Sequence, residues 1–103
     1  MKTRVQVGDR VEAFLKSLAP EPRRALVRAM KGLKNSEGDL KPLEGKLAGF
    51  SRLRVGAYRV IYVEECASGE RVIRCVFAER RAVVYSIFEK ILAQQLIGLI
   101  RPA

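Results

Sequence analysis

The spacing of hydrophobic residues changes along the chain and predicts where strands and helices lie. Residues 3–7, TRVQV, alternate between apolar and polar side chains, as in a short strand. Apolar residues then recur at helical spacing from Asp9, a candidate N-cap, until APEP at 19–22 ends that helix. Pro22 suits the first turn of a second helix, which ends before the loop at 35–39. The buried stripe predicted for this second helix comprises Ala25, Leu26, Ala29, Met30 and Leu33.

The second half of the chain predicts three strands and a final helix. A loop through LKPLEGKLAG leads to strands at about 50–55, 58–65 and 71–79, and the joins between them are short enough for hairpins. A strong apolar stripe then runs from about Ala82 to Ile100. The order β-α-α-β-β-β-α predicts an α+β fold, in which an antiparallel sheet carries a helical hairpin on one face and is followed by a C-terminal helix, with helices packed on one side.

The segment 51–63, SRLRVGAYRVIYV, has the pattern of a half-buried hairpin but contains three arginines. If Gly56-Ala57 is a two-residue turn, Arg54 faces Arg59, because successive side chains of a strand point to opposite faces. With a second turn at 68–69, the predicted core face collects Leu53, Val55, Tyr58, Val60, Tyr62, Ile73, Cys75 and Phe77. The predicted opposite face collects Arg52, Arg54, Arg59, Ile61, Val63, Arg74 and Val76.

The predicted pairing of Arg54 with Arg59 lowers the stability of the sheet. Like charges directly opposite on neighbouring strands destabilise a sheet by up to about 1 kcal/mol. A protein that binds a polyanion through these two arginines is expected to tolerate this loss of stability. The alternative is that nearby acidic residues neutralise the cluster and nothing binds; Glu44 and Glu79 are the nearest candidates in sequence.

Composition favours a single basic domain over residues 1–103. The chain is 49% hydrophobic, which supports a core, and its net charge of +9 favours nucleic acid or an acidic protein as a partner. Arginine outnumbers lysine by 13 to 7, and its planar fork suits phosphate. The N-terminus has no apolar targeting region and no segment approaches the roughly 18 apolar residues that span a membrane, so a soluble cytoplasmic protein is expected.

The two cysteines are expected to be reduced thiols. The turn at 68–69 places Cys75 opposite Tyr62 and leaves Cys66 about 13 Å away along the strand. A disulfide requires Cα atoms within about 7 Å. The chain has no histidine and only two cysteines, so neither a structural zinc site nor a cofactor is expected.

The run PLEGKLAGFSRLRVGAYRVIYV, followed after a strand by ERRAVVY, resembles toxins of the RelE/ParE superfamily from bacterial toxin–antitoxin operons. The likeness covers roughly residues 42–86, and the helical hairpin before it fits the order of elements in that family. The resemblance implies a metal-independent endoribonuclease of the RelE type, an mRNA interferase that cuts messenger RNA in the ribosomal A site and so inhibits translation. It also implies contact with ribosomal RNA and neutralisation by an acidic antitoxin in a hetero-oligomer, with no membrane association.

The resemblance also implies roles for particular residues. Arg59, Arg81 and Tyr85 match catalytic positions. Positions that bind the RNA backbone are matched by Lys46, Arg52, Arg54 and Arg80. This chain differs from the family pattern at Phe50, Ala57, Glu79 and Arg80.

The implied reaction is attack of the RNA 2′-OH on the adjacent phosphate, which needs no protein nucleophile. Tyr85 would act as the base, and Arg59 and Arg81 would stabilise charge in the transition state. Arginine is a poor proton donor, so water, the ribosome or Glu79 could supply the general acid. Two alternatives stay open: a ParE-type inhibitor of DNA gyrase, or a catalytically inactive relative that binds only its antitoxin or RNA.

Overall fold

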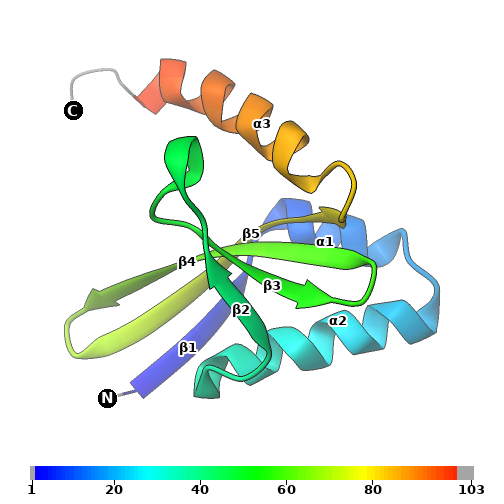
Figure 1. The fold of residues 1–103 in the computed structure, drawn as a ribbon. Helices are drawn as coiled ribbons and strands as arrows, with labels where there is room; N and C mark the ends of the chain where they lie inside the picture. The colour runs from blue at the N-terminus through cyan, green and yellow to red at the C-terminus, as the bar shows by residue number, and fades with distance from the viewer. Residues whose placement is uncertain (1, 100–103) are drawn as a thin grey trace.

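A five-stranded mixed sheet forms the centre of the computed structural model, which describes residues 2–99 (Figure 1). The strand order across the sheet is β1-β5-β4-β3-β2. The strands span β1 (Lys2–Val7), β2 (Asp39–Pro42), β3 (Ser51–Val55), β4 (Tyr58–Ala67) and β5 (Glu70–Arg80). The predicted α+β fold, the three consecutive hairpin-linked strands and the β3–β4 register are confirmed.

The sheet differs from the prediction in two ways. Its first strand, β1, pairs with β5 in parallel, so the sheet is mixed and not antiparallel. A further strand, β2, lies within the segment expected to be a loop and pairs with β3 at the sheet edge. This strand is only four residues long and ends at Pro42, which is tolerated because an edge strand needs fewer ladder hydrogen bonds.

Helices α1 (Asp9–Lys16) and α2 (Pro20–Gly32) cover one face of the sheet. Val11, Leu26 and Met30 are buried there against strand residues such as Leu53 and Val60. Two details differ from the prediction. The N-cap of α1 is Gly8, with Asp9 in the first turn, where its charge still favours the helix dipole. Ala25 is exposed and does not belong to the buried stripe of α2.

The C-terminal helix α3 (Val84–Leu99) packs on the opposite face of the sheet, so the helices do not share one side as predicted (Figure 1). Its Val84 and Phe88 are buried against Ile61 and Phe77. The ring of Phe88 stacks on Phe77 at 5.7 Å and meets Phe50 edge-on at 5.1 Å between centroids. The predicted helix end at Ile100 lies outside the described residues. Within residues 2–99, no helix combines the length and apolar character needed to cross a membrane.

A β-bulge in β5 moves Phe77 to the α3 face. The predicted pairing of Tyr62 with Cys75 is confirmed, but Val60 faces Ala78 instead of Phe77. Ile61 pairs with Phe77, so the register shifts by one residue at this point and later side chains change faces. The bulge therefore supplies the large side chain that holds α3 above the sheet.

The two cysteines differ in exposure, which predicts a difference in reactivity. Cys66 is exposed, whereas Cys75 is fully buried, and burial raises the pKa of its thiol to about 12. We expect a thiol reagent at pH 8 to modify only Cys66 in the native protein, because Cys75 forms almost no thiolate below that pKa. Thiol titration with and without denaturant checks this. Equal reaction rates of both thiols in the native protein would contradict it.

Candidate nucleic-acid interface and active site

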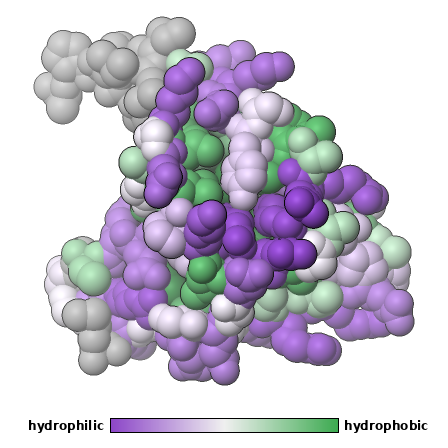
Figure 2. Space-filling model, in the orientation of Figure 1, coloured by the Kyte–Doolittle hydropathy of each residue, from purple (hydrophilic) through white to green (hydrophobic). Residues whose placement is uncertain are grey.

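Four arginines and a tyrosine gather on the α3 face of the sheet, near the β3–β4 turn. The turn contains Gly56, whose φ of 57° falls in the left-handed region that glycine adopts easily. It brings Arg54 opposite Arg59, as predicted. We call the set Arg52, Arg54, Arg59, Arg81 and Tyr85 the arginine cluster. Figure 2 shows hydrophilic side chains gathered over the middle of this view of the molecule, with hydrophobic ones between them.

Arg59 is the buried member of the arginine cluster. It is only 5% exposed and is the one charged residue that is buried among those the structure describes. Its Nη1 donates hydrogen bonds to the carbonyl oxygens of Gly56 and Tyr58, both at 2.9 Å. These bonds fix the guanidinium against the turn. No carboxylate within residues 2–99 forms an ion pair with Arg59, so its charge is left for a ligand.

The positive charges around Arg59 repel its guanidinium. Burial lowers the pKa of its guanidinium, and the charges of Arg54, Arg52 and Arg81 lower it further. Tyr85 acts in the opposite direction, which places it within electrostatic range of Arg59. An arginine nevertheless stays protonated at neutral pH. Binding an anion such as phosphate would therefore relieve repulsion that the free protein must bear.

An acidic residue does partly neutralise the arginine cluster, but it is neither of the two predicted. Asp39 begins β2 and lies opposite Arg54 in the sheet. Its carboxylate is 3.2 Å from Arg52 Nη1 and 4.0 Å from Arg54 Nη1. Asp39 is half exposed, so these ion pairs are weak. Asp39 was missed because it was assigned to the loop at 35–39, and the four-residue strand that it begins is too short to be recognised in the sequence.

The predicted acids Glu44 and Glu79 form no ion pair with the cluster among the described residues. Glu79 does lie directly opposite Arg59 in the sheet. Its Oε1 accepts a hydrogen bond from the backbone N–H of Arg80 at 2.9 Å. The carboxylate of Glu79 is thus engaged at the strand end.

Removing the charge of Asp39 is expected to tighten binding of a polyanion to the arginine cluster. Asp39→Asn leaves Arg52 and Arg54 uncompensated, and a pair of charges 4 Å apart in water is worth about 1 kcal/mol. We expect about three- to fivefold higher affinity for a short single-stranded RNA at low salt, and a loss of stability of at most about 1 kcal/mol. Fluorescence anisotropy measures the affinity. The control is Glu65→Gln, which removes the partner of Arg74 instead; an equal gain in both variants would contradict a specific role for Asp39.

The segment between β5 and α3 positions Arg81 and Tyr85. The backbone N–H of Arg81 donates to the carbonyl oxygen of Ala57 at 2.8 Å, which ties this segment to the β3–β4 turn. Tyr85 is the second residue of α3, where it is half-buried and packs against the cluster that contains Ile61 and Phe77. The sequence left two interpretations of Tyr85, a core aromatic or a member of the arginine face. The structure supports both, since Tyr85 packs on the core and lies near Arg59.

The structure does not bring Arg80 and Lys46 into the arginine cluster. Arg80 pairs with Tyr58 across the strands, and its guanidinium carbon lies 5.5 Å from the centre of the Tyr58 ring, on the face covered by α1. Lys46 is exposed in the 3-10 helix η2 (Gly45–Leu47). There it lines a hollow of about 370 Å³ together with Leu47, Glu89, Leu92 and Ala93.

Solved structures show the same fold. A YoeB/ParE toxin from Agrobacterium tumefaciens superposes with a TM-score of 0.62 at 16% identity, covering 79% of this chain and 99% of that one. The toxin–antitoxin complex RelBE2 of Mycobacterium tuberculosis gives a TM-score of 0.60 at 27% identity, covering 76% of this chain and 90% of its own. The archaeal RelE–RelB complex of Pyrococcus horikoshii gives 0.60 at 28% identity, covering 79% and 97%. This chain belongs to the RelE/ParE superfamily.

Membership in the RelE/ParE superfamily rests on structure and on the order of short motifs. No family model matches the sequence, and no curated protein matches it either. The neighbour at 16% identity supports the fold alone, whereas the two at 27% and 28% also support a toxin role. The resemblance drawn from the run around Arg59 is thereby confirmed. One position at which this chain departs from the RelE/ParE pattern, Phe50, is used for packing against Phe88.

Proposed function

We propose that this RelE/ParE-superfamily toxin is a ribosome-dependent endoribonuclease that cleaves messenger RNA in the ribosomal A site and so inhibits translation. The observation that carries the proposal is Arg59, a buried guanidinium without a carboxylate partner among the described residues, with Arg54 and Arg81 around it. A protein that bound no polyanion would gain stability by replacing such a residue. The site therefore suits a phosphodiester.

The proposed reaction is an internal transesterification. The 2′-oxygen attacks the adjacent phosphorus, the P–O5′ bond breaks, and the products are a 2′,3′-cyclic phosphate and a 5′-hydroxyl. The phenolate form of Tyr85 accepts the proton from the 2′-OH as general base and becomes the neutral phenol. The leaving O5′ receives a proton from solvent. No protein nucleophile is needed, so the absence of histidine from the sequence does not prevent the chemistry.

The members of the arginine cluster divide the remaining work. Arg59 and Arg81 stabilise the negative charge that develops on the phosphate oxygens. Arg59 suits this role because its guanidinium is held rigidly by two backbone carbonyls and costs little reorganisation. Arg52 and Arg54, which are more accessible than Arg59 and are paired to Asp39, hold the flanking backbone. Asp39 is displaced from them when RNA binds.

The partner that controls this activity is proposed to be an acidic antitoxin. Two structural neighbours were solved as complexes, RelBE2 and RelE–RelB. The net charge of +9 favours an acidic chain that shields the basic surfaces in a toxin–antitoxin hetero-oligomer. The site of action is the cytoplasm, where ribosomes translate.

The test of the proposed function compares two targets with the same purified protein. A defined message is incubated with and without programmed ribosomes, and breaks are mapped by primer extension; DNA supercoiling by gyrase is followed in parallel. We expect breaks only when ribosomes are present, and unaffected supercoiling. Intact message with inhibited gyrase would identify a ParE-type toxin instead. Intact message with active gyrase would identify a catalytically inactive relative.

A further inference from the structure

A second basic surface lies away from the arginine cluster, along α2 and the edge strand β1. We call it the α2–β1 basic surface. Its members are all exposed: Lys2, Arg4, Arg24, Arg28, Lys31 and Lys34. The spacing of Arg24, Arg28 and Lys31 places three of these cations on one face of α2 over about 10 Å. Because α2 packs on the face opposite α3, the surface cannot act through the arginine cluster.

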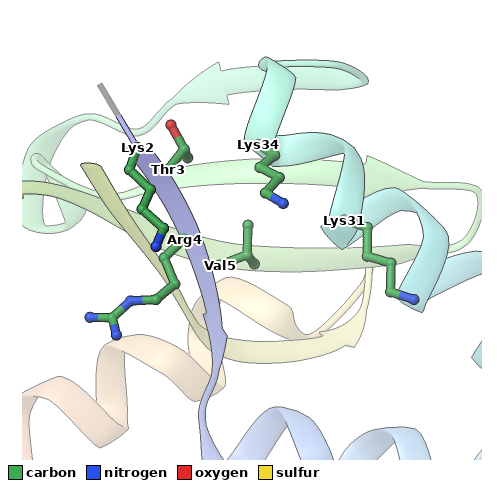
Figure 3. Close-up of a pocket in the computed structure, with 6 residues that line it drawn as sticks. All are labelled: Lys2, Thr3, Arg4, Val5, Lys31 and Lys34. Atoms are coloured by element: carbon green, nitrogen blue, oxygen red, sulfur yellow. The ribbon is translucent and has the colours of Figure 1, made fainter. Parts of the chain in front are cut away.

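Two hollows make this surface continuous. One, of about 450 Å³, is lined by Lys2, Thr3, Arg4, Val5, Lys31 and Lys34. Figure 3 shows its four cationic side chains, two carried by β1 and two by the neighbouring helical segment. The other, of about 320 Å³, is lined by Arg23, Arg24, Val27, Arg28 and Lys31. Lys31 belongs to both hollows and joins them.

Most cations of this surface are available to a ligand. Arg4 lies 3.8 Å from a carboxylate oxygen of Glu70. In the part of the chain that the structure describes, no carboxylate lies within 4.0 Å of the other five cationic groups. Arg23 differs, because its guanidinium donates to the carbonyl oxygens of Leu15 and Leu18 and so holds the end of α1. Arg23 therefore has a structural use, whereas among the six members defined above only Arg4 has a carboxylate partner in the described residues.

We propose that the α2–β1 basic surface binds the phosphate backbone of double-stranded RNA without regard to sequence. Proteins that bind single strands combine cations with aromatic side chains on which bases stack. No aromatic residue lines either hollow. Duplex RNA is recognised by shape and phosphate contacts, for which a rigid row of cations suffices. The arginines of the row can each make forked contacts with two phosphate oxygens, which lysine cannot.

Substitutions that replace exposed cations with neutral glutamine test this proposal. The variant R24Q/R28Q/K31Q removes three exposed cations of the surface, and the control R10Q/K16Q/K90Q removes three exposed cations elsewhere. Binding to an RNA duplex of about 16 base pairs is measured between 50 and 200 mM salt, without ribosomes, over roughly the range in which phosphate contacts show their salt dependence. We expect the first variant to bind about 10- to 100-fold more weakly, with a salt slope reduced by about 2–3.

Three outcomes would overturn the proposal. Equal losses in the two variants would mean that net charge alone governs binding. A loss confined to a single-stranded oligonucleotide of the same length would exclude the duplex as ligand. A loss of binding to polyglutamate, with duplex binding retained, would assign the surface to an acidic polypeptide. Because the assay measures duplex binding and not cleavage, its result is independent of the function proposed for Arg59.

Discussion

Replacing Arg59 with alanine is expected to lower the rate of ribosome-dependent mRNA cleavage by about 10²- to 10³-fold, the usual cost of removing one preorganised donor from a developing oxyanion. The guanidinium is buried and held by the carbonyl oxygens of Gly56 and Tyr58, so it meets the phosphate without reorganising. Single-turnover cleavage of a programmed message measures the effect. The loss should fall on the rate constant more than on the toxin concentration at half-maximal rate, because Arg52 and Arg54 still bind the backbone.

The control for Arg59→Ala is Arg74→Ala. Arg74 stands opposite Val63 in the sheet, is half exposed and pairs with Glu65 at 3.5 Å. Removing it changes the net charge equally but leaves the arginine cluster intact, so cleavage should stay within about threefold of wild type. Thermal melting of both variants checks folding. A folded Arg59→Ala protein that cleaves as fast as wild type would contradict the role given to Arg59.

The second large effect is expected from Tyr85→Phe, which removes a hydroxyl and keeps the ring. A general base contributes about 10²- to 10⁴-fold, so we expect a rate loss in that range. The half-buried ring packs against the cluster of Ile61 and Phe77, and phenylalanine preserves that packing, so stability should change little. The same single-turnover assay measures the rate, and chemical denaturation measures the stability.

A matched control for Tyr85→Phe is Tyr58→Phe. Tyr58 lies on the other face of the sheet, where its ring contacts Phe14 and Arg80, and its hydroxyl has no role in the proposed reaction. Cleavage by this variant should be close to that of wild type. If Tyr85→Phe retains full activity and only Tyr85→Ala loses it, Tyr85 supports the structure and another group is the base.

The sequence predicts the positions of those arginines in the cluster that depend only on the geometry of one hairpin. A glycine-containing two-residue turn sets the register of the hairpin, and alternation then assigns Arg54 and Arg59 to one face. Farther along, the same alternation fails, because the bulge in β5 carries Phe77 to the α3 face and leaves Ala78 on the other. A one-residue bulge cannot be recognised from the sequence here, because the residues on both sides of it are apolar.

The parts that could not be predicted depend on contacts between distant segments. Asp39 meets Arg52 and Arg54 only because a short edge strand returns to β3, and its pattern is too brief to distinguish from a loop. The parallel pairing of β1 with β5 likewise joins segments about 70 residues apart, so nothing local specifies it. Arg80 is next to Arg81 in sequence but faces away, because the strand continues through residue 80.

The most direct test of the proposed reaction is a message with a single 2′-deoxynucleotide immediately 5′ of the scissile phosphate. Its cleavage on programmed ribosomes is compared with that of the all-ribose message, and the new ends are identified by their chemistry. If the 2′-oxygen is the nucleophile and the arginine cluster stabilises its attack, the deoxy message stays intact at that position, while the ribose message yields a 2′,3′-cyclic phosphate and a 5′-hydroxyl. Cleavage of the deoxy message at the same rate, or a 5′-phosphate at the new end, would contradict the account.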